Sequence, residues 1–165
     1  MFKIILIATD LSDTSEYALN VAAQVAREHG SRLHLAHVIR DPATEPWALE
    51  AFGADFGALL EETRARAKQA LVARADRLSL PDGVRSEILV GAPAEEIVRY
   101  ANEIAADLIV VGSHGRTFMQ RVFLGSVADR VLRHAACPVL VVRPAASTTT
   151  AIDHAAEPDA TVVRG

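Results

Sequence analysis

Short apolar runs alternate along this chain with longer segments in which apolar residues recur at helical spacing. The first run, residues 2–8, is a continuous β-branched and aliphatic stretch, as expected of a strand buried on both faces of a parallel sheet. Further strands are predicted at residues 31–39, 85–90, 108–111 and 139–142, and helices from residue 12 or 13 to 30, from about 56 to 79, from 93 to about 105 and from about 125 to 134. This alternation predicts an α/β sandwich around a parallel sheet with right-handed crossovers.

The composition indicates one globular domain followed by a segment of a different kind. Half of the 165 residues are hydrophobic, which is enough for a single sizeable core, so we expect one domain over residues 1–143. Residues 144–165 are rich in Ala, Thr and short polar residues without an amphipathic period, and are expected to form a flexible C-terminal tail. The irregular connection at residues 40–57, which contains Trp47, is expected either to cover the edge of the sheet or to meet a partner.

Charge and cysteine content argue against several classes of protein. Seventeen Lys and Arg are mixed with 21 Asp and Glu, for a net charge of −4, so neither nucleic acid nor an anionic membrane is an expected partner. The longest apolar run, Ile4 to Ala8, is too short to span a membrane and lacks a signal-peptide cleavage site, so a cytoplasmic location is expected. Cys137, the only cysteine, is expected to be a small buried filler. The six histidines show no ligand spacing, so no protein-held metal is expected.

Glycines after the predicted strand 108–111 indicate phosphate binding. Gly112 and Gly115 follow that strand directly, and Gly125-Ser126 opens the next helical segment. A glycine at a strand end allows a ligand to approach the backbone closely, and a helix start offers N–H groups and a positive dipole end to an anion. The chain has neither a Walker A motif nor a Gly-x-Gly-x-x-Gly, which argues against a motor NTPase and a dinucleotide dehydrogenase.

The same glycines carry a family resemblance. Gly112, Gly115, Gly125 and Ser126 fulfil the pattern Gly, two residues, Gly, nine residues, Gly-Ser, and the chain thereby resembles the ATP-binding branch of the universal stress protein family over roughly residues 2–143. Other matching segments are Ile7-Ala-Thr-Asp-Leu-Ser, Gly91-Ala-Pro, Asp107-Leu-Ile-Val-Val-Gly-Ser-His-Gly and Cys137-Pro-Val-Leu-Val-Val. The resemblance implies a three-layer sandwich of the adenine nucleotide alpha-hydrolase-like type, with a five-stranded parallel sheet in the order 3-2-1-4-5.

The resemblance also implies ATP as the ligand, with any Mg²⁺ or Mn²⁺ carried by its phosphates. Asp10 would bind the ribose hydroxyls, and Val38 would contribute to the adenine pocket. The remaining implied nucleotide-binding residues are Ala8 and Thr9 beside the base or sugar, Val111 at the end of its strand, Gly112 and Gly115 towards the phosphates, and Gly125, Ser126 and Val127 at the terminal phosphates. Two departures concern Leu11, which stands where the family often has glycine, and Ala128, which stands where it often has a hydroxyl.

Several alternatives remain open from the residues themselves. Asp10 could serve only as a loop residue or helix cap. His114 could act as a general base or be a tolerated turn residue, and Arg116 and Arg121 could reach phosphate or only solvent.

These observations leave three hypotheses about function. The first is a nucleotide-dependent stress regulator with at most slow ATP hydrolysis, the second an ATP-dependent hydrolase or transferase, and the third a nucleotide-free dimeric interaction module. The apolar segment Val139 to Arg143 is predicted to be an edge strand, and the resemblance implies that it pairs with its twofold mate in a homodimer.

Overall fold

The computed structural model describes residues 2–40, 56–113 and 124–143. Within these ranges the elements are β1 (Ile4–Ala8), α1 (Asp13–His29), β2 (Arg32–Ile39), α3 (Phe56–Arg77), β3 (Val84–Val90), α4 (Pro93–Glu103), β4 (Leu108–Gly112), α5 (Ser126–His134) and β5 (Val139–Val142). The predicted succession of strands and helices is confirmed, with α3 and α4 ending slightly earlier than expected. The segment around Trp47, the residues His114, Gly115, Arg116 and Arg121, and the predicted tail 144–165 lie outside the described residues.

The strands form one parallel sheet in the order β3-β2-β1-β4-β5. β1 lies at the centre, where Ile7 is opposite Leu35 of β2 on one side and Val110 of β4 on the other. This is the strand order that the family resemblance implied, and it is confirmed.

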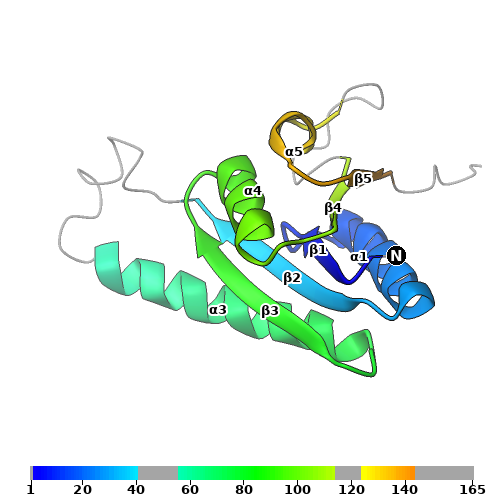
Figure 1. Ribbon diagram of the computed structural model, residues 1–165. Coiled ribbons are helices and arrows are strands. Elements are labelled where there is room, and N and C mark those ends of the chain that lie inside the picture. The colour runs from blue at the N-terminus through cyan, green and yellow to red at the C-terminus, as the bar shows by residue number, and fades with distance from the viewer. Residues whose placement is uncertain (1, 41–55, 114–123, 144–165) are drawn as a thin grey trace, which may run out of the picture.

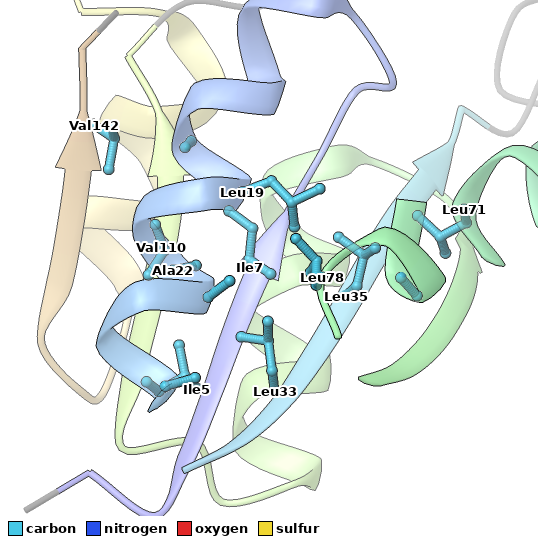
Figure 2. Packing of buried hydrophobic residues seen from close by; sticks show 14 of the residues in the cluster. Ile5, Ile7, Leu19, Ala22, Leu33, Leu35, Leu71, Leu78, Val110 and Val142 are labelled. Carbon is cyan, nitrogen blue, oxygen red and sulfur yellow. The ribbon is translucent and has the colours of Figure 1, made fainter. Parts of the chain in front are cut away.

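Helices cover both faces of the sheet, because side chains alternate between the faces of each strand and create two cores. On one face Ile5, Ile7 and Leu35 pack against α1 and α3, as Figure 2 shows. On the other face Leu6 and Ile109 pack with residues of α4 and α5. Figure 1 shows α3 running along β2 and β3 on one side, with α4 and α5 on the opposite side. The predicted three-layer sandwich is therefore confirmed.

The helix ends follow the local signals in the sequence. Gly30 ends α1 in the left-handed conformation at φ 63°, and its N–H donates to the carbonyl of Ala26. Pro93 stands in the first turn of α4, where a missing N–H has no cost. Gly125 is the N-cap of α5. These residues set where each helix starts or stops relative to the sheet edge.

Asp107 ties the turn before β4 to the beginning of β1. Its Oδ2 accepts the N–H groups of Lys3 at 2.7 Å and Ile4 at 2.9 Å. Hydrogen bonds from the backbone of Ile4 and then of Lys3 hold the pKa of the Asp107 carboxyl below its usual value. The contact aligns the starts of the two central strands.

Cys137 lies between α5 and β5 and is half-buried rather than fully buried as expected. It packs against the cluster of α4 and α5, and burial raises the pKa of its thiol. The raised pKa disfavours the reactive thiolate, in keeping with a packing role.

Candidate functional site

The carboxyl ends of β1 and β4 lie side by side, and the chain leaves them in opposite directions. Ala8 at the end of β1 pairs with Val111 near the end of β4. After β1 the chain continues into α1, which packs on one face of the sheet, whereas α5, the helix that follows β4, packs on the other. In a parallel sheet this divergence opens a crevice at the topological switch point, where ligands of such folds bind.

A cavity of about 970 Å³ occupies this crevice. Its volume is at the upper end of the range usual for small-molecule sites. Every described residue that the resemblance implied lies on its wall: Ala8, Thr9, Asp10, Val38, Val111, Gly112, Gly125, Ser126 and Val127. Gly115 lies outside the described residues.

The loop after β1 is held by a chain of hydroxyl hydrogen bonds. The Ser15 hydroxyl donates its one proton to the carbonyl of Ser12 at 2.7 Å. In the 2.8 Å hydrogen bond between the Thr9 and Ser15 hydroxyls, Thr9 is therefore the donor and Ser15 the acceptor. The N–H of Leu11 in turn donates to Thr9 Oγ1 at 3.0 Å. Thr9 and Ser15 are both buried, so this loop is fixed from inside the protein.

Asp10 shapes the same loop while lining the cavity. Its Oδ1 accepts the N–H of Ser12 at 3.1 Å and the Ser12 hydroxyl at 2.5 Å. Asp10 therefore does stabilise the loop before α1, as one of the two interpretations expected. An ionised carboxylate accepts up to about four hydrogen bonds, so this role is compatible with an additional ligand contact.

His37 is a cavity residue that the sequence analysis did not single out. Its Nδ1 lies 2.8 Å from the carbonyl oxygen of Thr9, and since a carbonyl only accepts, Nδ1 carries the proton. The contact joins the end of β2 to the end of β1 at the cavity. A polar ring near the carboxyl end of a largely buried strand was the available signal.

Gly112 and the beginning of α5 form the end of the cavity that offers hydrogen-bond donors to an anion. Ser113 donates its N–H to Val142 and accepts the N–H of Gly125, each at 2.8 Å, so the Gly125 amide is already engaged. Gly125 has no side chain with which to cap α5. The N–H groups of Ser126 and Val127 belong to the first turn, which has no intrahelical acceptors, and both residues line the cavity.

Ala128 lines the cavity and is also buried in the cluster between the sheet, α4 and α5. Its methyl group stands where the family often has a hydroxyl, so this position contributes packing and no side-chain hydrogen bond.

One face of α3 forms a wall of the cavity that the sequence analysis did not identify. Thr63, Arg66, Ala67 and Ala70 of α3 line the cavity at successive helical turns. Arg66 is exposed and pairs with Glu62 at 2.5 Å, and with Arg40 it adds positive charge to the cavity wall.

The described residues, 2–40, 56–113 and 124–143, also bear on metal binding and membrane crossing. Within these ranges no three His, Cys, Asp or Glu side chains are grouped as a metal site would require. None of the described helices combines the length and apolarity needed to cross a membrane.

Comparison with known proteins agrees with this architecture. The profile of the Universal stress protein family matches residues 1–143. Over 149 residues the chain is 36% identical to a universal stress protein of Methanocaldococcus jannaschii, covering 87% of this chain and 83% of that protein. The solved structure of universal stress protein UspA from Lactobacillus plantarum is similar with a TM-score of 0.74 and 33% identity, over 86% of this chain and 97% of that one.

A further solved structure is that of a universal stress protein in complex with cAMP. It is similar with a TM-score of 0.62 and 28% identity, over 86% of this chain and 97% of that one. The sheet order, the motif at the switch point and these matches lead to one conclusion: the chain belongs to the universal stress protein family.

Proposed function

We propose that this protein binds an adenine nucleotide, ATP in particular, in the switch-point cavity, and that it acts as a nucleotide-dependent regulator in the stress response with at most slow ATP hydrolysis. The observation that carries the proposal is the convergence of Asp10, Val38 and the first turn of α5 on one cavity. These groups come from three separate parts of the chain and supply a carboxylate, an apolar wall and N–H donors.

The residues present fit such a ligand. Val38, Ile97 and Val111 offer apolar surface to a planar base. Asp10 offers a carboxylate to ribose hydroxyls, and the N–H groups of Ser126 and Val127 suit phosphate oxygens at a helix start. The related structure with cAMP supports an adenine nucleotide as the ligand class. ATP is proposed over cAMP because the cavity continues from Asp10 to the start of α5. The N–H groups at that helix start could then bind the phosphate chain of ATP.

Isothermal titration of the purified protein with ATP, ADP, cAMP and GTP tests this proposal. Beforehand, the protein is denatured and the released material is analysed for copurified nucleotide. We expect saturable binding with ATP as the tightest ligand and GTP as the weakest. If no nucleotide is released and none of the four binds, the proposal is wrong; if cAMP binds more tightly than ATP, the ligand assignment is wrong.

The alternative of an ATP-dependent hydrolase or transferase rests on His114 as a general base, and this residue lies outside the described range. Turnover measured with His114→Ala tests it, because unchanged turnover would remove the only catalytic candidate of that hypothesis.

We further propose that the protein forms a homodimer through β5 and Arg143. β5 is the terminal strand of the sheet, and Leu140 on it is exposed. An apolar edge strand gains hydrogen bonds and loses exposed apolar surface when it pairs with a second copy.

A further inference from the structure

Arg74 of α3 reaches across to the loop that carries Asp10. Its Nη2 donates to the carbonyl oxygen of Leu11 at 2.9 Å. Its Nη1 donates to the carbonyl of Ala70 at 3.2 Å. Its Nε lies 2.7 Å from Oε1 of Glu16, and this contact is an ion pair without the geometry of a hydrogen bond. A single guanidinium therefore joins α3, the start of α1 and the loop between β1 and α1.

The loop needs such support at Leu11. This residue has φ 64°, in the left-handed region that favours glycine, and its carbonyl is the acceptor for Arg74. On the amide side, the Leu11 N–H is held by Thr9. Leu11 is thus fixed through both its amide and its carbonyl in a conformation that leucine rarely adopts, directly after Asp10.

The environment of Arg74 makes these contacts effective. Its side chain is only 16% exposed, so its interactions are screened less by solvent than those on the outer surface of α3. The planar guanidinium presents five donors in a fixed fork, which suits several acceptors at once, whereas a lysine ammonium is a compact point charge on a flexible stem.

We propose that Arg74 is a positioning residue for ribose recognition: by holding the Leu11 carbonyl, it orients the Asp10 carboxylate towards the sugar hydroxyls of the bound nucleotide. The inference rests on the proposed function and deepens it, because it assigns the orientation of Asp10 to a residue of α3 that does not line the cavity.

Arg77 is a matched control on the same helix. Arg77 Nη2 also pairs with Glu16, at 3.2 Å, but its side chain is 64% exposed, and this contact is to Glu16 rather than to the loop. Arg74→Met and Arg77→Met therefore remove the same charge next to the same partner, and only the first removes the bond to Leu11.

The test is titration calorimetry of the two variants with ATP and with 2′,3′-dideoxy-ATP, which lacks the hydroxyls that Asp10 would bind. For Arg74→Met we expect about tenfold weaker ATP binding, the low end of what a charge-assisted hydrogen bond contributes, and an unchanged affinity for 2′,3′-dideoxy-ATP. Arg77→Met is expected to bind both ligands like the unaltered protein. Arg74→Lys, a milder change to use where the methionine variant fails to fold, is expected to show the same selective loss in smaller measure.

The outcomes separate the two proposals. An equal loss for ATP and 2′,3′-dideoxy-ATP, or no loss for either, would overturn the positioning role while leaving the nucleotide site intact. Failure of the unaltered protein to bind ATP would overturn the proposed function itself, and the role of Arg74 with it.

Discussion

Asp10 accepts two hydrogen bonds from Ser12 through one carboxylate oxygen, while the residue lines the cavity. At the scale of single residues, this means that a change at position 10 acts on the loop as well as on a ligand. The two effects can be separated, because an asparagine keeps a neutral oxygen for Ser12 but loses the negative charge. Ribose recognition by the charge can thus be tested with the loop largely preserved.

We predict that Asp10→Asn weakens ATP binding by about 10- to 100-fold, the range expected for losing hydrogen bonds to a charged group. The dissociation constant from titration calorimetry measures the loss. Asp13→Asn is the control, since Asp13 is exposed at the first position of α1 and is not among the residues lining the cavity. Equal affinities for the Asp10 variant and the unaltered protein would contradict ribose binding by Asp10.

At the scale of elements, β2 and α4 are joined by a buried polar pair. His34 Nδ1 lies 3.0 Å from the Tyr100 hydroxyl, and His34 is only 7% exposed. Burial is the main cause that lowers the pKa of His34 from its ordinary 6.5, followed by Arg85 and Arg32, while Glu87 acts in the opposite direction. The neutral ring is therefore the form that the packed sheet and helix accept.

This pair predicts a pH dependence of folding. Because the pKa of His34 is lower in the folded state, the unfolded chain takes up the proton first as the pH falls below 6.5, and stability is lost from there down to the folded pKa. The free energy of unfolding, measured by urea titration at several pH values, is expected to decline over that interval. His34→Gln keeps a hydrogen-bonding group opposite Tyr100 without an ionisable ring, and should flatten the decline.

His134→Gln is the control for this prediction. His134 lies at the exposed end of α5, where its ring nitrogen contacts the carbonyl of Arg130, so its replacement is expected to leave the decline in place. If the free energy of unfolding of His34→Gln declines with falling pH as that of the unaltered protein does, the buried pair does not cause the decline.

At the scale of the whole molecule, β5 is the last strand of the described sheet, and the proposed homodimer would pair through the side of its backbone that faces away from β4. Ile109 donates to Pro138, and Ser113 donates to Val142, so the even-numbered residues of this strand face β4. Hydrogen-bonding groups alternate between the two sides of a strand, so the N–H groups of Val139, Val141 and Arg143 point away from β4. These are the donors that an antiparallel twofold mate would use.

We predict that Val141→Pro shifts the protein from dimer to monomer at micromolar concentration. Proline removes one outward N–H and leaves the bonds from β4 in place. Sedimentation equilibrium measures the change, and Val141→Ala, which shortens the side chain but keeps the N–H, is expected to remain dimeric. If unaltered protein sediments as a monomer, or if both variants dissociate alike, the proposed pairing through the β5 backbone is wrong.

Local signals explain how much of the fold could be predicted. Apolar runs and helical spacing located the elements, and Gly30, Pro93 and Gly125 located helix ends, since capping and backbone preferences act over a few neighbouring residues. The strand order came from the family resemblance, because periodicity does not specify which strands become neighbours. The glycines and Asp10 likewise placed the cavity only once their family pattern was recognised.

The remaining features depend on contacts between distant parts of the chain. Arg74 meets Leu11 across 63 positions, and Asp107 meets Lys3 across 104. No local pattern marks such pairs, because they arise from how α3 and β4 pack against the rest of the molecule. By itself the sequence determined the elements, their ends and the glycine motif, because these follow from short-range preferences. The tertiary structure alone decided that His37 and the α3 wall line the cavity and that Arg74 supports Leu11 beside it, because packing sets which faces of separate elements meet.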